Sequence, residues 1–148
     1  MITKEKVLEQ IRFARLNHKR WMNYAKAIYL GLPVKEDAAP LFDTDCQFGK
    51  WYHGEGQVFR GMPSFDKIDD FHHALHEVYM NFFKTWKEST QPKWFESKKA
   101  VETRRNKKMK ELLDQLSEIS RLLIEQLDQF ERDIKSLNEW EFKQALAN

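Results

Sequence analysis

Glycine and proline are confined to one part of this sequence. All five glycines and all four prolines lie between residues 31 and 92, so residues 1–30, 64–91 and 93–148 contain neither. Because these two residue types most often interrupt helices, each of the three stretches can form a continuous helix. The distribution predicts an all-α protein, a bundle of about four to five helices.

The first stretch carries an inward-facing stripe at helical spacing. Residues that recur in steps of three and four share one face of a helix. Here they are Val7, Ile11, Ala14, His18, Trp21, Ala25 and Ile28. Thr3 can cap the start of this helix, and Gly31 followed by Pro33 can end it. We therefore expect His18 on the inward face, where a core residue would normally be apolar.

The middle of the chain, residues 32–63, is expected to be a connection that contains one short helix. The polar residues 43–45 can cap a turn that begins near Cys46, and Gly54 with Gly56 would end it. The N-terminus of a helix lowers the pKa of a thiol, and so does a bound metal. We therefore expect Cys46 to bind a metal as the thiolate.

A third helix is expected to begin at Ser64, with Asp66 in its first turn. Its inward stripe again steps by four and three. The members are Ile68, His72, Leu75, Tyr79 and then Phe82 or Phe83. A second histidine thus occupies an inward position, and residues 86–92 follow as a polar connector.

The C-terminal stretch is long enough for one helix of roughly 80 Å, at about 1.5 Å per residue. Its apolar residues form a heptad seam with one residue inserted. They are Met109, Leu112, Leu116, Ile119, Leu123, Leu127, Phe130, Ile134 and Leu137. We divide the chain into a helical region, residues 1–90, and a long C-terminal helix, residues 91–148, that completes the bundle or forms a dimer interface. Such a helix would extend beyond its shorter partners, so we expect a homodimer in which part of the seam pairs between chains.

The charge of the chain is balanced overall but segregated within the C-terminal stretch. Its 25 basic and 23 acidic residues give a net charge of +2, which does not indicate a nucleic-acid-binding protein. Residues 93–111 hold eight basic and three acidic residues, and residues 112–148 hold four and eight. The two halves could match in an antiparallel pairing, or the basic half could bind an anionic partner.

Membrane and secretory classes are not indicated by the sequence. No apolar run approaches the roughly 20 residues that span a bilayer, and the N-terminus lacks the apolar core of a signal peptide. We therefore expect a cytoplasmic protein without a membrane contact. The chain has one cysteine, which excludes disulfide frameworks and four-cysteine zinc sites.

Six residues could ligate a metal: His18, Cys46, His53, His72, His73 and His76. Imidazole and thiolate are a good donor set for zinc, and His72 with His76 has the i, i+4 spacing that places two imidazoles on one helix face. His18 could meet them from the first helix, with Cys46 completing the set. A buried core histidine and a cysteine used as a small apolar residue are the alternatives, and spacing alone leaves both interpretations open.

Three segments in order resemble a known family. They are His18-Lys-Arg-Trp21, then Cys46-Gln-Phe48-Gly49-Lys-Trp51, then His72-His-Ala-Leu-His76. This pattern resembles the CZB family, the chemoreceptor zinc-binding domain, over about residues 11–85. The resemblance implies Zn²⁺ bound by His18, Cys46, His72 and His76, with Trp21, Phe48, Gly49 and Trp51 as supporting positions. His53 and His73 depart from the pattern, and either could replace a ligand or be a surface residue.

The function that the resemblance implies is sensory. CZB domains are attached to cytoplasmic chemoreceptors or to diguanylate cyclases, where zinc or an oxidant acting at the cysteine–zinc centre sets the output. Four protein ligands leave no open position on zinc, and no other catalytic motif stands out, so we expect no enzyme. Output would pass through a dimer or through a chemoreceptor-type or cyclase-type partner. The alternatives are an adaptor bundle with purely structural zinc and a hemerythrin-type di-metal protein.

Overall fold

The computed structural model describes residues 1–35, 42–88 and 91–147. Within these ranges it contains helices and no strands. The elements are α1 (Lys4–Tyr29), α2 (Gln47–His53), the short 3₁₀ helix η1 (Glu55–Phe59), α3 (Pro63–Lys87), α4 (Lys98–Ser136) and α5 (Glu139–Ala147). The predicted all-α helical bundle is confirmed. Part of the predicted connector at 86–92, residues 89–90, lies outside the described residues, as does Pro40.

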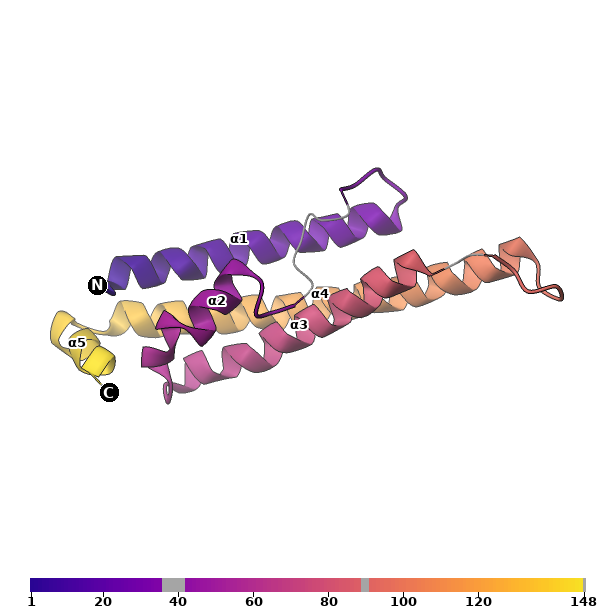
Figure 1. Cartoon of the computed structure of the whole chain (residues 1–148). Helices are drawn as coiled ribbons and strands as arrows, with labels where there is room; N and C mark the ends of the chain where they lie inside the picture. The colour runs from indigo at the N-terminus through magenta and orange to yellow at the C-terminus, as the bar shows by residue number, and fades with distance from the viewer. Residues whose placement is uncertain (36–41, 89–90, 148) are drawn as a thin grey trace.

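Three long helices make the body of the molecule, and α4 is the central one. It packs against α3 along most of its length and against α1 on another side, while α1 and α3 touch each other little (Figure 1). The short elements α2 and η1 lie across one side of this body, and α5 packs on η1 at the end where both termini lie. The far end of the α3–α4 hairpin extends beyond α1 (Figure 1).

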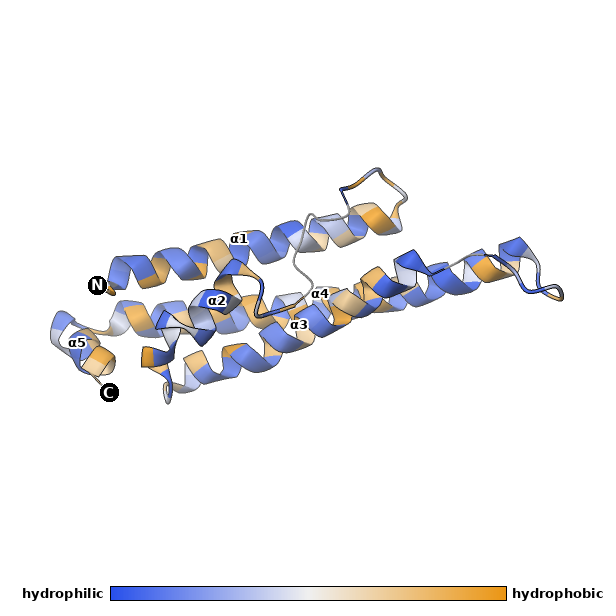
Figure 2. Cartoon of the chain, viewed as in Figure 1, coloured by the Kyte–Doolittle hydropathy of each residue, from blue (hydrophilic) through white to orange (hydrophobic). Residues whose placement is uncertain are grey.

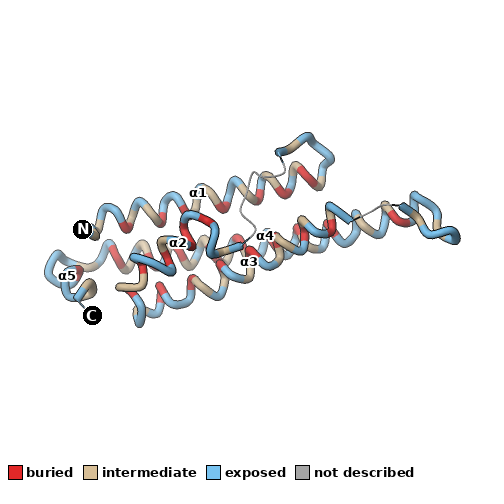
Figure 3. The backbone as a smooth tube through the Cα atoms, in the orientation of Figure 1, coloured by how far each residue is buried: buried red, intermediate tan, exposed pale blue. Residues whose placement is uncertain are grey.

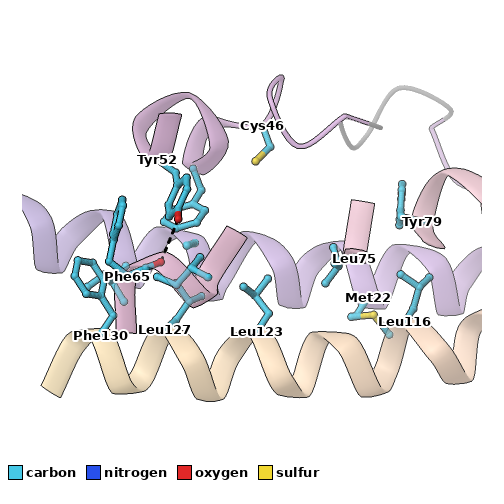
Figure 4. Packing of buried hydrophobic residues seen from close by; sticks show 14 of the residues in the cluster. Met22, Cys46, Tyr52, Phe65, Leu75, Tyr79, Leu116, Leu123, Leu127 and Phe130 are labelled. Atoms are coloured by element: carbon cyan, nitrogen blue, oxygen red, sulfur yellow. Dashed lines mark hydrogen bonds between the residues drawn. The ribbon is translucent and has the colours of Figure 1, made fainter. Parts of the chain in front are cut away.

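The core follows the inward faces of these helices. Hydrophobic residues alternate with hydrophilic ones along each helix (Figure 2), and the buried positions recur once per turn on α1, α3 and α4 (Figure 3). Figure 4 shows where α2 is fastened to this core: the Tyr52 hydroxyl donates to the Phe65 carbonyl at 3.1 Å, and the two rings stack 4.3 Å apart. This contact holds α2 against the start of α3.

The ends of α1 agree with the sequence, and its buried stripe differs at one position. The Thr3 hydroxyl accepts a hydrogen bond from the Lys6 amide, and Gly31 takes a positive φ of 72° after the last turn. Met22 is buried where the periodicity predicted Trp21, which is half-buried. The residue three or four positions after His18 can face inward, and here it is the fourth, Met22, that lies in the core.

The start of α3 corrects a second expectation. Ser64 is not the N-cap; the helix begins at Pro63, after Met62, and Ser64 is buried within the first turn. Proline suits this first position because its missing N–H would have no partner there. The inward stripe of α3 is confirmed as Ile68, His72, Leu75, Tyr79 and Phe82, whereas Phe83 is half-buried.

The seam on α4 is more regular than the sequence suggested. Its buried members are Met109, Leu113, Leu116, Ser120, Leu123, Leu127, Phe130 and Ile134, which step by four and three without interruption. The predicted inserted residue is therefore absent: Leu113 and Ser120 face inward, and Leu112 and Ile119 are only half-buried. These seam residues are buried within one chain against α1 and α3, so this seam does not need a second chain to cover it.

The C-terminal stretch contains two helices instead of the one that was expected. The Asn138 side chain accepts a hydrogen bond from the Glu141 amide at 2.9 Å, and the Glu141 carboxylate accepts one from the Asn138 amide at 2.7 Å. This reciprocal pair is a capping box, which starts a new helix without any Gly or Pro. It turns α5 back, so that Phe142 packs on Phe59 at 6.0 Å between ring centroids.

Replacing Asn138 with alanine is expected to lower the free energy of unfolding by about 1 kcal/mol, because the Glu141 amide loses its acceptor. Urea unfolding followed by circular dichroism measures this. Gln144→Ala, at an exposed position of α5, is the control and should change stability by less than about 0.5 kcal/mol. Equal stability of the two variants would contradict the role of the capping box.

None of the helices in the described part of the chain is both long enough and apolar enough to cross a membrane.

Candidate metal centre

Four buried side chains with metal-ligating atoms meet between α1, α2 and α3. One ligand atom from each of His18, Cys46, His72 and His76 lies within 4.8 Å of every other. His18 comes from the middle of α1, Cys46 is the residue before α2, and His72 and His76 are one turn apart on α3. The structure thus brings together the four residues that the sequence singled out, and we call them the His₃Cys cluster.

His18 is oriented by its own helix. Its Nδ1 donates to the Ala14 carbonyl at 2.6 Å, one turn earlier on α1. Its Nε2 is buried and has no hydrogen-bond partner. A metal-binding histidine commonly uses one ring nitrogen as a donor to a backbone carbonyl and presents the other to the ion. His18 has this arrangement, and a metal ion would satisfy an atom that is otherwise costly to bury.

Cys46 and His72 form the tightest contact in the cluster. The Cys46 Sγ lies 3.2 Å from the His72 Nε2, and it accepts a hydrogen bond from the Gly49 amide at 3.1 Å. Cys46 therefore caps α2 itself, a role that the sequence assigned to the preceding polar residues. In Figure 4 its side chain points from this turn toward the helices of the body.

The helix N-terminus is not sufficient by itself to lower the pKa of the Cys46 thiol below its usual value. Burial raises the pKa of Cys46 to about 11, although the Gly49 and Phe48 amides lower it. Cys46 is 0% exposed, and at the helix N-terminus this desolvation outweighs the favourable amides. The sulfur is therefore a neutral thiol in the metal-free protein, and forming the thiolate there requires a cation.

Gly49 allows the backbone to pass close to the cluster. A Cβ at this position would lie 1.7 Å from the Asp43 carbonyl oxygen and 3.2 Å from the His72 Cε1. Any residue larger than glycine would push the loop before α2 away from α2 itself. The close approach of the two segments therefore explains why the Cys46–Trp51 segment has a glycine at position 49.

Aromatic rings enclose the cluster. Trp21 lies 4.6 Å from His18 and 5.1 Å from His76 between ring centroids, and Phe48 lies 5.3 Å from His72. Trp51 stands further out, against Phe48, where it also packs over the backbone of Gly56. Trp21 and Phe48 thus shield the imidazoles from solvent, which strengthens electrostatic interactions within the cluster.

Two of the buried histidines, His18 and His72, are neutral in the metal-free protein at pH 7. Burial lowers the pKa of His18 from 6.5 to about 4, and burial with the neighbouring His18 and His76 lowers that of His72 to about 2. A neutral imidazole has a free lone pair, which is the form that binds a metal. The lowered pKa values and the unpartnered His18 nitrogen therefore both favour metal binding by neutral imidazoles.

The metal-free protein is expected to lose stability as the pH falls from about 7 to about 5. Below pH 6.5 the unfolded chain binds protons at His18 and His72 that the folded chain does not bind. The free energy of unfolding should therefore fall by up to about 1.4 kcal/mol per pH unit for each of these two histidines. Urea unfolding in the presence of a chelator measures this, and a stability that stays constant over the range would contradict it.

The other two histidines lie outside the cluster, on the surface. His53 Nε2 is 3.6 Å from Asp69 Oδ1, and His73 Nδ1 is 3.2 Å from Asp43 Oδ2. Neither replaces a member of the cluster. The sequence considered both as alternative ligands but overlooked the two aspartates, although Asp69 and His73 have i, i+4 spacing on α3.

The His₃Cys cluster suits zinc chemically. Three imidazoles and one thiolate are borderline-soft donors, and four of them complete a tetrahedral zinc site of the closed, structural type. No carboxylate belongs to this cluster among the described residues. A hemerythrin-type di-metal centre would need further histidine and carboxylate ligands, so the geometry does not favour that alternative.

Comparison with known proteins agrees with this geometry. Residues 18–81 match the family model described as the chemoreceptor zinc-binding domain, CZB. The matched range begins at His18 and includes Cys46, His72 and His76, while α4 and α5 lie outside it. The resemblance to this family is thereby confirmed over these residues. No curated protein and no solved structure matches the chain.

Proposed function

Because residues 18–81 match the zinc-binding domain of chemoreceptors, we propose that this chain is a zinc-dependent sensory module. Its His₃Cys cluster would hold one Zn²⁺ through His18, Cys46, His72 and His76. The observation that carries the proposal is the buried His18 Nε2, which lacks a partner and lies among three other ligand atoms. The function of the ion is regulatory rather than catalytic, because four protein ligands leave no position for substrate or water.

Zinc would act by joining helices that otherwise contact each other little. The ligands come from α1, from the start of α2 and from α3, and α1 and α3 share few direct contacts. Both pack on α4, which runs beyond the site in both directions (Figure 1). Binding or release of the ion would therefore change how α1 lies against the α3–α4 pair, and α4 would carry that change toward a partner.

Oxidation of Cys46 supplies a second input. A groove of about 290 Å³ lies beside the cluster, lined by Phe42, Asp43, His73, His76, Glu77 and Met80. His76 forms part of the wall of this groove and is itself 2% exposed, so a small oxidant would have to pass its side chain to reach Cys46. A peroxide or hypochlorite that takes two electrons from the Cys46 sulfur would convert the thiolate to a sulfenic acid, a poor zinc ligand. Zinc would then leave.

The output surface is proposed to lie on α1 or on the hairpin tip. Phe13 and Leu16 on α1 are 41% and 46% exposed, and Trp94 before α4 is 96% exposed. Exposed apolar side chains of this size favour contact with another protein. A homodimer, or a partner of the chemoreceptor or cyclase type, would read the position of α1 through such a contact.

Metal analysis of the purified protein tests the proposal, with one zinc per chain as the expected result. Cys46→Ser should release that zinc to a weak chelator, and hypochlorite should release it from the unaltered protein, as followed with a zinc-sensitive dye. Lys50→Ala, at an exposed position of α2, should behave like the unaltered protein. A Cys46→Ser variant with unchanged zinc content and affinity would contradict the ligand assignment. Zinc that stays bound under both chelator and oxidant would indicate a purely structural ion.

A further inference from the structure

A second group of metal-ligating side chains lies outside the His₃Cys cluster, on the surface where α2 meets α3. Ligand atoms of Asp43, His53 and Asp69 all lie within 4.8 Å of one another. Asp43 precedes α2, His53 is its last residue, and Asp69 lies on α3 one turn before His72. Three separate segments thus bring two carboxylates and one imidazole to a common point.

Asp69 has an oxygen that the protein leaves unsatisfied. Its Oδ1 is shielded from solvent and accepts no hydrogen bond. The His53 Nε2 is 3.6 Å away, which is too long for a hydrogen bond. A shielded carboxylate oxygen without a donor is costly. A cation placed between this oxygen and the His53 nitrogen would remove that cost.

Asp43 is held so that its carboxylate faces the same point. Its Oδ1 accepts from the Thr44 amide at 2.9 Å, and its Oδ2 lies 3.2 Å from His73 Nδ1. Like charges destabilise each other when they are brought together. The convergence of Asp43 and Asp69 therefore favours a divalent cation, while His73 pairs with the Asp43 carboxylate beside it.

We propose that Asp43, His53 and Asp69 form a second site for a divalent transition-metal ion, with Zn²⁺ as the probe. Its donors are nitrogen and oxygen without a thiolate, and its side chains reach solvent, so it binds zinc more weakly than the His₃Cys cluster. The site lies beside the cluster: the Asp43 carbonyl packs on Gly49, next to His72. An ion there would brace the loop that presents Cys46. The rival interpretation is a pair of histidine–aspartate ion pairs without a metal.

Calorimetric titration of zinc into protein that already carries one zinc tests the proposal. A second, weaker binding event is expected in the unaltered protein. His53→Ala and Asp69→Asn should each weaken this event at least about 10-fold. Both positions are exposed or half-buried, so these variants should fold. Asp70→Asn is the matched control, an exposed neighbour on α3, and it should leave the second event unchanged.

Failure of this inference differs from failure of the proposed function. Cys46→Ser should remove the tight event and keep the weak one, whereas Asp69→Asn should do the opposite. The inference is overturned if the unaltered protein shows no second event up to about 1 mM zinc. It is equally overturned if His53→Ala and Asp69→Asn leave that event as strong as Asp70→Asn does.

Discussion

His72→Gln is expected to weaken zinc binding by more than about 100-fold, because it removes a ligand at the centre of the cluster. His72 is 0% exposed and its Nε2 lies 3.2 Å from the Cys46 sulfur, so no other described side chain can take its place without rearranging the core. Glutamine keeps most of the side-chain volume, which limits the loss of packing. Competition against a chelator of known zinc affinity measures the effect.

His73→Gln is the matched control for this experiment. His73 is the next residue on α3, but its side chain is 67% exposed and pairs with Asp43 outside the cluster. Tight zinc binding should therefore remain within about twofold of the unaltered protein, because no cluster ligand is lost. Equal losses in the two variants would show that the cluster is not the tight zinc site. Circular dichroism of both variants establishes that each is folded.

Gly49→Ala is expected to lower the free energy of unfolding by about 3 kcal/mol and to weaken zinc binding as well. The new Cβ would lie 1.7 Å from the Asp43 carbonyl oxygen, a backbone atom that cannot rotate away. Either the loop before α2 or α2 itself must shift. Cys46 lies where the loop joins α2, so either shift moves the thiol relative to the three histidines.

Thermal unfolding with and without zinc measures this effect, and Lys50→Ala provides the comparison. Lys50 follows Gly49 on α2 but is exposed, so its replacement should change stability by less than about 0.5 kcal/mol. The zinc-bound and zinc-free forms of Gly49→Ala should unfold at more similar temperatures than those of the Lys50→Ala protein. A Gly49→Ala protein as stable as the control would contradict the close approach of the two segments.

Much of the fold could be predicted because helix formation is largely local. The stretches without Gly and Pro became helices, Thr3 caps α1, and the stripe on α3 is buried as its spacing indicated. The errors occur where local rules allow two answers. Trp21 and Met22 are both consistent with the α1 stripe, and packing against α4 selects Met22 for the core.

The errors on α4 and α5 have different origins. Counting apolar residues favoured Ile119, but the face that packs on α1 and α3 places the small Ser120 inward. A pattern based on hydrophobicity cannot anticipate a polar residue at a close helix contact. The end of α4, by contrast, could have been predicted from the sequence, because Asn138 and Glu141 have the spacing of a capping box. A search for Gly and Pro alone does not detect this motif.

Local rules applied to the sequence suffice to predict the long helical stretches, the order of the ligating residues and the spacing that puts His72 and His76 on one face. Those are properties of local geometry and side-chain chemistry. Packing between distant segments sets the rest: which nitrogen of His18 lacks a partner, and that the α4 seam is covered within one chain. The same packing buries Cys46, and this burial raises the pKa of its thiol. These outcomes depend on desolvation and on contacts between distant segments, which are set only when the three helices pack together.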